Sequence, residues 1–349
     1  MSKQHVVVLM GGKSGEHEVS LVSARSVIAA LDPERWDVTP LGIARDGAWL
    51  TADETAAALD VGATSFEQGT PLLSAHSSME TLASADVVFP LIHGTFGEDG
   101  TLQGFLEMAG LPYAGAGVAA SAIGMDKAVM KALFRDAGVP VTPYVVVRSW
   151  EFEADPAQCH RFVEESLGYP CFAKPANGGS SVGVSKVESR EDLDGAFAAA
   201  FAYDDKAVIE EAVAGQEVEV SVLGNEFPEP SIPGEIAPDR DFYDYESKYD
   251  SGSTSELYIP ARIDDDTAER VRMMAVRMFQ AMGCEGYARV DFFVRDGQEV
   301  LANEVNTIPG FTSISMYPKL WEATGIGYSD LLTHILELAL ARHEREARR

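Results

Sequence analysis

RVDFFVRDGQEVLANEVNTIPGFTSISM, residues 289–316, is the stretch of sequence that decides the fold. It contains two runs rich in β-branched and aromatic residues, VDFFV and EVLANE, which are typical of β-strands. Asp296-Gly297 between them is a strong signal for a tight hairpin turn. With those two residues as the turn, the stretch predicts an antiparallel hairpin in which position i pairs with position 593 − i.

The predicted hairpin gathers charged and amide side chains on one face. In this register Arg289 faces Glu304, and Asp291 faces Ala302. Because side chains alternate along a strand, Asn306 shares their face. If the face is buried, these polar groups need partners, and a pair of Mg²⁺ ions carrying a polyphosphate would satisfy them, because Mg²⁺ takes oxygen ligands. The alternative at this point is a solvated strand face with an Arg–Glu cross-strand pair.

Length and composition narrow the class of protein. A chain of 349 residues exceeds one core, so two or three domains are expected, and 46% hydrophobic residues exclude a disordered chain. No run of about 18 apolar residues is present, so no membrane partner is expected. The three cysteines lack a disulfide or zinc spacing and indicate a cytoplasmic location. The formal net charge of −28 argues against nucleic acid as a partner.

The N-terminal segment resembles a Rossmann-like half. A strand over His5–Met10 is followed by a Gly-Gly turn and a helix over Val19–Leu31. Gly12-Lys13-Ser14 looks like the end of a P-loop, but Val7 stands where that motif needs glycine, so the motif is rejected. Glu16 lies in the turn, either as a carboxylate that compensates the helix dipole or as an ammonium-binding group.

Three further segments carry candidate site residues. His93 ends a buried strand, where a histidine is either structural or a ligand contact at the carboxyl edge of the sheet. Lys174 ends a strand that enters the loop ANGGSSVG, which is small enough to close backbone N–H groups over phosphate oxygens. Residues 234–263 have no clean periodicity and carry several aromatic side chains, so we expect an ordered lid.

Eight segments occur in an order that resembles the D-alanine–D-alanine ligase family of the ATP-grasp superfamily. They are GGKSGEHEVS, HGTFGEDGTLQG, GMDK, KPANGGSSVGVSK, EEAVAGQE, FYDYESKY, ARVDFF and NEVNTIPGFTS. The resemblance covers nearly the whole chain and implies an α/β ATP-grasp fold of three subdomains. It implies an N-terminal Rossmann-like (pre-ATP-grasp) domain over 1–124, a central subdomain over 125–218, and a C-terminal subdomain over 219–349 with a lid at about 234–258.

On the nucleotide side, the resemblance implies ATP and two Mg²⁺ ions as cofactors, with Mn²⁺ as the alternative ion. Position 211 carries Glu where some members have Lys, so the adenine pocket is expected to bind mostly through backbone groups. The implied residues are Lys127 and Lys174 for the phosphates, Lys248 for the γ-phosphate, Glu210, Glu211 and Val213 for adenine, Glu217 for the ribose, and Asp291, Glu304 and Asn306 for the metal.

On the amino-acid side, the resemblance implies two D-alanine sites. The implied residues are Glu16 for the ammonium of the first D-alanine, His93 beside it, Ser180 and Tyr249 in a hydrogen-bonded link with Glu16, and Gly310, Ser315 and Met316 at the second site. Joining a carboxylate to an amine forms a tetrahedral oxyanion, which needs fixed donors. Arg289 and the Gly310 N–H are the expected donors.

The implied activity is ATP-dependent ligation of two D-alanines to D-alanyl-D-alanine through a D-alanyl phosphate, for peptidoglycan precursor synthesis. An acyl phosphate hydrolyses in water, so a lid is chemically required. The alternatives are a D-Ala–D-lactate or D-Ala–D-serine ligase, another ATP-grasp carboxylate–amine ligase, and a nucleotide-binding protein without catalysis. Tyr249 in the lid favours the dipeptide ligase. The family also suggests a homodimer.

Overall fold

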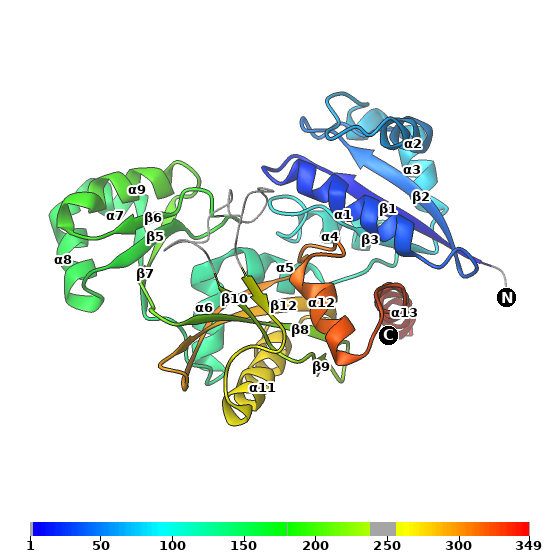
Figure 1. Cartoon of the computed structure of the whole chain (residues 1–349). Coiled ribbons are helices and arrows are strands. Elements are labelled where there is room, and N and C mark those ends of the chain that lie inside the picture. Colours follow the sequence, from blue (N-terminus) through cyan, green and yellow to red (C-terminus); the bar gives the residue numbers. More distant parts are fainter. Residues whose placement is uncertain (1–2, 180, 238–255, 349) are drawn as a thin grey trace.

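The structure, a computed structural model, describes residues 3–179, 181–237 and 256–348 and contains three β-sheets. Figure 1 shows the four-stranded sheet at one end, the N-terminal sheet at the other, and the six-stranded sheet between and below them. This is the mixed α/β architecture that the sequence predicts. No helix of these residues is long and apolar enough to cross a membrane. Ser180, Lys248 and Tyr249 lie outside the described residues.

The N-terminal unit is a parallel sheet of order β2-β1-β3. The predicted strand and helix around the Gly-Gly turn are present as β1 and α1. Its elements are β1 (Gln4–Gly11), α1 (His17–Ala30), β2 (Trp36–Ile43), α2 (Ala52–Asp60), α3 (His76–Ala83), β3 (Val87–Pro90) and α4 (Thr101–Met108).

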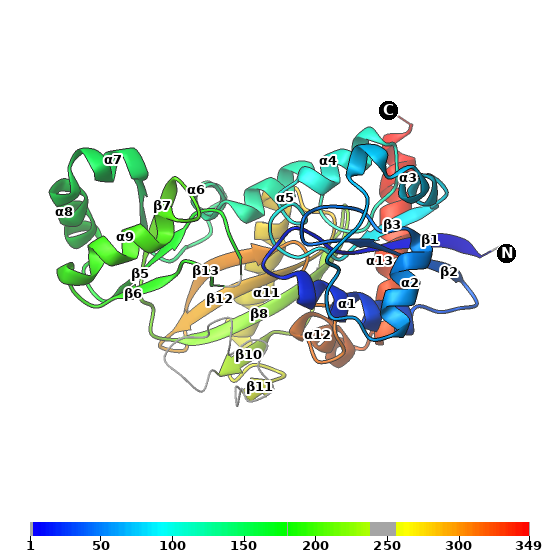
Figure 2. The same cartoon turned by 90° about the horizontal axis from the view of Figure 1, so that it is seen from above.

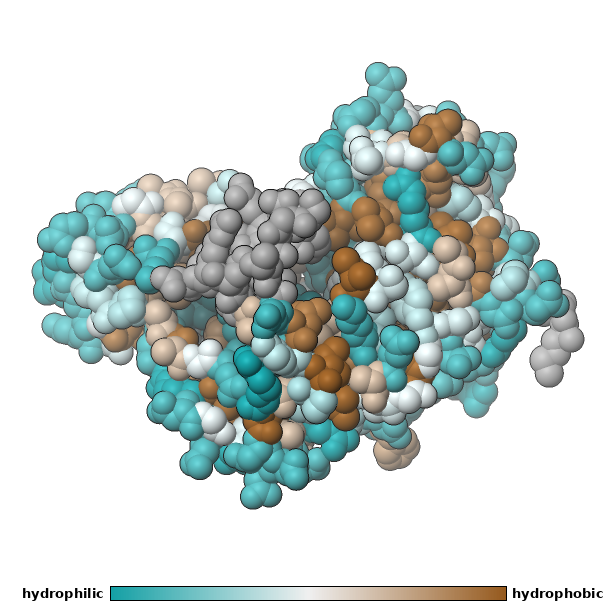
Figure 3. All heavy atoms as spheres, viewed as in Figure 1, coloured by the Kyte–Doolittle hydropathy of each residue, from teal (hydrophilic) through white to brown (hydrophobic). Residues whose placement is uncertain are grey.

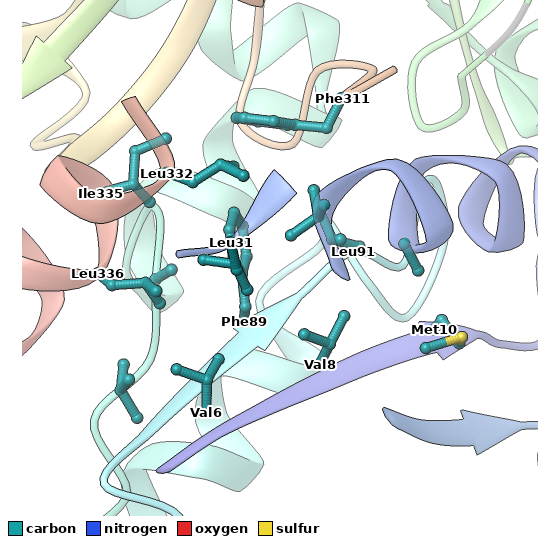
Figure 4. Packing of buried hydrophobic residues seen from close by; sticks show 14 of the residues in the cluster. Val6, Val8, Met10, Leu31, Phe89, Leu91, Phe311, Leu332, Ile335 and Leu336 are labelled. Atoms are coloured by element: carbon teal, nitrogen blue, oxygen red, sulfur yellow. The ribbon is translucent and has the colours of Figure 1, made fainter. Parts of the chain in front are cut away.

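The last helix of the chain, α13 (Tyr328–Glu346), packs on this N-terminal sheet. Figure 4 shows Leu332, Ile335 and Leu336 of α13 converging with Val6 of β1 and Phe89 of β3. These side chains are almost fully buried in one core, and each contributes roughly 1.5–3 kcal/mol of transfer free energy. The two ends of the chain therefore form one unit. The loop before α12, which includes Phe311 of the same core, is held against the N-terminal sheet.

The central unit is an antiparallel sheet of order β4-β7-β5-β6, with its own hydrophobic core. Its helices lie at the outer end of the molecule in Figure 1. On the face shown in Figure 3, hydrophilic side chains dominate its periphery, in keeping with the strongly negative net charge. Its elements are β4 (Tyr144–Arg148), α7 (Ser149–Ala154), α8 (Pro156–Ser166), β5 (Cys171–Pro175), β6 (Ser185–Val187), α9 (Leu193–Phe201) and β7 (Lys206–Glu211).

The third sheet has the path β11-β10-β8-β12-β13, with β9 paired to β8. Helices α5, α6 and α11 cover one of its faces, and Figure 2 shows the sheet between the other two units. Its elements are α5 (Val118–Met125), α6 (Lys127–Asp136), β8 (Gln216–Gly224), β9 (Glu229–Pro230), β10 (Gly234–Ala237), β11 (Glu256–Tyr258), α11 (Asp265–Ala281), β12 (Gly286–Arg295), β13 (Glu299–Asn306) and α12 (Met316–Thr324). The subdomain boundaries after residues 124 and 218 stay a prediction, since α6 and the whole of β8 pack with this sheet.

Alternation along β12 separates a core face from a polar face. Val290, Phe292 and Val294 are buried beneath the helices in the second core. Arg289 and Asp291 point to the opposite face, because successive side chains of a strand alternate. The polar face of the predicted hairpin is therefore real, and it is directed away from the helical layer.

The register of the hairpin was predicted wrongly by two residues. Arg289 pairs with Asn306, and Asp291 pairs with Glu304. The four polar residues still share one face, because an even shift preserves the alternation, whereas a shift by one would reverse it.

Two one-residue offsets add up to this shift. Asp296 and Gly297 form the turn, as predicted, both with positive φ (52° and 70°), yet Arg295 pairs with Glu299 instead of Gln298. A bulge between Asp291 and the next residue of β12 supplies the second offset.

Two helix caps also differ from the simple sequence signals. The Asp-x-x-Glu pattern of Asp266 and Glu269 predicts a cap at Asp266, but Asp264 caps α11 by accepting from the backbone N–H of Thr267. Ser329 is the capping residue that the sequence predicts for the last helix, but Gly327 precedes α13. In both cases the helix begins about two residues earlier than its capping motif suggested, and boundaries of this kind are the least certain part of a sequence pattern.

Candidate active site

The polar face of the third sheet is an acidic cluster organised around Arg289. The Arg289 guanidinium donates to the Asp291 carboxylate at 2.8 and 2.7 Å and lies 3.2 Å from a Glu219 oxygen of β8. The Asn306 amide donates to Asp291 at 2.9 Å. Burial lowers the pKa of Arg289, but Asp291 and Glu219 outweigh it and raise that pKa well above its usual value. Arg289 is therefore a permanent cation within an acidic surface.

The predicted metal ligands fit a hard divalent cation. Asp291 and Glu304 are directly opposite each other across β12 and β13, and Asn306 adds an amide. Opposed Cβ atoms in such a pair lie about 5 Å apart, so their oxygens can converge on one ion. Two carboxylates and an amide oxygen are the donor set that Mg²⁺ accepts. No group of three or more His, Cys, Asp or Glu side chains suited to a metal occurs among residues 3–179, 181–237 and 256–348, so the site depends on the amide and on a ligand such as phosphate.

The facing wall carries a buried cluster of opposite charge. The Glu210 carboxylate of β7 lies 2.8 Å from Lys174 Nζ and 3.4 Å from Lys131 Nζ of α6. Burial raises the pKa of Glu210, but the two lysines outweigh it and hold that pKa below its usual value. Burial lowers the pKa of Lys131, and Glu210 only partly offsets it. Glu210 is thus charged, and its side chain serves the lysines, which leaves its backbone for any adenine contact.

The N-terminus of α6 docks onto the Gly/Ser loop. Lys127 donates from Nζ to the carbonyl oxygen of Gly178 at 2.6 Å and from its backbone N–H to that of Ala176 at 2.9 Å. Asp126 caps the helix and pairs with Lys206. Lys127 therefore lies at the loop that was expected to close over phosphate.

The remaining predicted nucleotide residues lie where the two sheets meet. The Glu211 carboxylate bonds Arg295 Nη2 at 2.5 Å and so links β7 to the tip of the β12–β13 hairpin. Val213 lies in the connection between β7 and β8, half-buried. Glu217 lies at the start of β8, opposite Phe293 of β12.

Glu16 lies directly before α1, in the space between two loops. A Cβ atom added to Gly94 would lie 2.9 Å from Glu16 Oε2, and one added to Gly179 would lie 3.6 Å from the same oxygen. The turn that carries Glu16 is fixed by Ser14, whose hydroxyl accepts from the Glu16 N–H at 3.1 Å and donates to the His93 carbonyl at 2.7 Å. The carboxylate thus faces both loops predicted to surround the first substrate.

His93 is buried and already occupied by protein partners. One ring nitrogen lies 3.0 Å from Ser23 Oγ, and the other lies 2.9 Å from the carbonyl oxygen of Ile308. Burial lowers the pKa of His93 to about 4, so the ring is neutral at physiological pH.

The loop of the second predicted substrate site precedes α12. A Cβ atom at Gly310 would lie 3.0 Å from Ser315 Oγ, so the backbone approaches that hydroxyl closely. Ser315 Oγ also accepts from the Thr312 N–H at 3.1 Å. The Met316 side chain packs with Leu320 in a small core, so only its backbone is free to face a ligand.

Comparison with known proteins identifies the family. The model of the D-ala D-ala ligase N-terminus matches residues 5–116, and that of the D-ala D-ala ligase C-terminus matches residues 133–337. The chain belongs to the D-alanine–D-alanine ligase family. It is 48% identical over 357 residues to the D-alanine–D-alanine ligase of Geobacillus thermodenitrificans, covering 99% of this chain and 97% of that protein. It is 49% identical to that of Deinococcus radiodurans over 343 residues, covering 97% and 99%.

Two solved structures that resemble this chain are ligases named for different second substrates. The D-alanine–D-alanine ligase from Coxiella burnetii superposes with a TM-score of 0.83 at 34% identity, over 99% of this chain and 98% of that chain. The VanG D-Ala:D-Ser ligase from Enterococcus faecalis gives 0.81 at 33% identity, over 97% and 100%. The fold of this ligase family is therefore shared by enzymes named for different second substrates, and the fold alone does not select between them.

The sequence patterns did not indicate two residues of the site, Lys131 and Glu98. Lys131 follows Lys127 by one helical turn, and this i, i+4 spacing was the available signal that both share one face of α6. Glu98 accepts hydrogen bonds from the backbone N–H groups of Gly94 at 2.7 Å and Ile308 at 2.9 Å. Burial and the neighbouring Glu16 raise the pKa of Glu98 to about 8. Nothing local in the sequence predicted this contact, because Ile308 is more than 200 residues away.

Proposed function

We propose that this chain joins two molecules of D-alanine to D-alanyl-D-alanine with the consumption of ATP, through a D-alanyl phosphate intermediate, in the synthesis of peptidoglycan precursors. The observation that carries the proposal is the pairing of an acidic wall, which contains Asp291 and Glu304, with a wall that contains Lys131 and Lys174. Glu304 is close enough to Lys131 to raise the pKa of that lysine against the effect of burial. Opposed walls of opposite sign suit a nucleotide bound together with divalent metal ions.

The basic wall would bind the phosphates of ATP, and the acidic wall would bind the metal ions. Lys127 and Lys174 would hold phosphate oxygens beside the Gly/Ser loop, and Lys248 would reach the γ-phosphate. Asp291, Glu304 and Asn306 would hold two Mg²⁺ ions, or Mn²⁺ as the alternative. A metal bound there supplies neutralisation of the charge on the transferring phosphoryl group. Glu210, Glu211 and Val213 would line the adenine pocket through backbone groups, and Glu217 would bind the ribose.

The first substrate is held by its ammonium at Glu16, which forms a hydrogen-bonded link with Ser180 and Tyr249. Its carboxylate oxygen attacks the γ-phosphorus, which forms a P–O bond and breaks the bond to ADP. The acyl phosphate must be shielded from water until the amine arrives. Tyr249 in the segment over 234–258 supports the dipeptide specificity.

The amine of the second D-alanine, held near Gly310, Ser315 and Met316, attacks the acyl carbon and expels phosphate. The tetrahedral oxyanion accepts hydrogen bonds from Arg289 and from the Gly310 N–H. Arg289 has five N–H donors. Its Nε and Nη2 atoms hold the carboxylates, which leaves donors for the oxyanion. Preorganised donors of this kind contribute roughly 10²–10³ in rate each.

The deciding experiment is phosphate release from ATP with D-alanine, compared with L-alanine, D-lactate and D-serine as substrates. D-alanine alone should drive release and yield the dipeptide. No release with D-alanine would contradict the proposal, and a strong preference for a mixed product with D-serine or D-lactate would favour the corresponding ligase. We also propose a cytoplasmic homodimer, which sedimentation would test.

A further inference from the structure

The peptide unit of Ile308 is held on both sides by side chains of a distant loop. Its N–H donates to Glu98 at 2.9 Å, and its carbonyl oxygen lies 2.9 Å from a ring nitrogen of His93. Glu98 and His93 belong to one turn after β3, in the N-terminal unit. Ile308 as a whole residue is only 4% exposed, so both backbone groups are removed from water and need these partners.

The two holding side chains are fixed in turn. Glu98 uses its second oxygen to accept from the Gly94 N–H at 2.7 Å. His93 bonds the hydroxyl of Ser23 on α1 at 3.0 Å, and the same hydroxyl accepts from the Phe311 N–H at 3.5 Å. The segment over 308–311 is therefore held at both ends by the N-terminal unit.

This segment lies between two groups of the proposed reaction. Ile308 is two residues after Asn306, a proposed metal ligand, and two residues before Gly310, a proposed oxyanion donor. The loop that holds it also borders the Glu16 carboxylate, since Gly94 approaches Glu16 closely. The first substrate's site and the metal and oxyanion groups thus meet at one backbone contact.

We propose that Glu98 and His93 are positioning residues that clamp the Ile308 peptide and thereby align Asn306 and the Gly310 N–H with the substrate held at Glu16. The inference rests on the proposed function. It assigns His93 a role through Ile308 in place of direct contact with D-alanine. A displacement of about 1 Å at a reacting centre can lower the rate roughly 10²-fold, so a clamp this far from the chemistry has a measurable effect.

The first test is the exchange rate of the Ile308 amide in the resting enzyme, measured by NMR on protein labelled with ¹⁵N-isoleucine. Glu98→Ala should raise that rate about tenfold through loss of one hydrogen bond, while the other isoleucine amides keep theirs. Asp99→Asn is the matched control. Asp99 also accepts from two backbone N–H groups, those of Phe96 at 2.8 Å and Thr101 at 2.9 Å, but both lie in its own loop. Unchanged exchange at Ile308 in Glu98→Ala would overturn the clamp.

The second test separates the two nitrogens of His93. The amide of His93→Asn can replace the ring nitrogen that faces Ile308, whereas that of His93→Gln can replace the one that faces Ser23. Asn should keep most of kcat. Gln should lower kcat by roughly 10²-fold with little change in KM for ATP. Equal kcat in the two variants, or a change confined to KM for D-alanine, would overturn the proposal and return His93 to the substrate site.

The activity of the wild-type enzyme distinguishes failure of this inference from failure of the proposed function. If wild type releases phosphate with D-alanine but Glu98→Ala matches it in kcat, the contact is only structural and the positioning role is wrong. If wild type shows no activity with D-alanine, the proposed function is wrong. Glu98→Gln, which keeps the size of the side chain and one acceptor oxygen, should fall between wild type and Glu98→Ala in kcat, and a kcat equal to wild type would also count against the clamp.

Discussion

The acidic and basic walls of the site have the same arrangement of charges with the signs exchanged. On the acidic wall, one guanidinium, that of Arg289, lies among the carboxylates of Glu219, Asp291 and Glu304. On the basic wall, one carboxylate, that of Glu210, lies between two lysines. In each wall the single side chain of opposite charge holds its neighbours in place. The acidic wall keeps an excess of negative charge, and the basic wall keeps an excess of positive charge.

The two walls differ in the ligand that their excess charge can bind. The acidic wall keeps negative charge for metal ions, and the basic wall keeps positive charge for phosphates. Removing a carboxylate should therefore have different consequences on the two walls. On the acidic wall, where carboxylates are in excess, it should lower activity. On the basic wall, where both lysines share the Glu210 carboxylate, it should lower stability.

The largest expected effect is that of Glu304→Gln on turnover. Loss of a metal ligand should lower phosphate release with D-alanine by roughly 10³-fold, since metal stabilisation of the transition state is worth several kcal/mol. The melting temperature should stay the same or rise, because the wall has carboxylates in excess. Glu299→Gln, at the exposed far end of the same strand, is the control. Near-normal turnover in Glu304→Gln would remove the metal assignment.

On the basic wall, Glu210→Gln should lower the free energy of unfolding by about 3–5 kcal/mol, because the buried Lys131 and the largely buried Lys174 lose their common anion. Lys131→Met should cost less, about 1–3 kcal/mol, since Glu210 keeps Lys174 as its partner. Urea unfolding without nucleotide measures both. If Lys131→Met were the more damaging change, Glu210 would not be the residue that holds this wall together.

The contributions of Glu98 and Glu210 to the stability of the fold should respond oppositely to pH. The folded state keeps the Glu98 proton up to about pH 8, whereas the unfolded state releases it near the ordinary glutamate pKa of 4.5. Between these values the unfolded state binds fewer protons, so Glu98 makes stability fall as pH rises. Glu210, whose pKa is lowered, contributes stability that is lost as pH falls through 4.5.

The measurement is the free energy of unfolding of wild type and Glu98→Gln at about pH 5 and about pH 8. Wild type should lose more stability than the variant over this interval. Parallel curves would mean that the environment of Glu98 does not resist its ionisation.

Local patterns in the sequence predicted most of the fold, and long-range contacts account for what they missed. The Asp296-Gly297 turn and the polar face of the hairpin were predicted correctly. The register was not, because the turn and a bulge in β12 each add an offset of one residue, and the position of a bulge is not encoded in a local pattern.

The site residues show the same difference between local patterns, which could be predicted, and long-range contacts, which could not. Lys174 ends a strand that enters a glycine-rich loop, so its sequence context indicates phosphate contact, whereas the same role for Lys127 was implied only by the family resemblance. Glu98 becomes informative only when the chain brings Ile308 to it. The partners of His93 are also distant in sequence, at separations of 70 and 215 residues, so a strand-end histidine could be placed at the site but not assigned its contacts.

The smallest expected effect concerns the ion pair between Glu211 and Arg295, which joins β7 of the basic wall to the tip of the acidic hairpin. Both side chains are about one-third exposed (32% and 27%), so the pair should contribute only about 0.2–1 kcal/mol. A double-mutant cycle with Glu211→Gln and Arg295→Gln, read by urea unfolding and by KM for ATP, measures the coupling. A small coupling energy with little change in KM means that the walls hold their charges independently. A coupling well above this range, with a raised KM, would mean that this contact holds the two walls at their working separation.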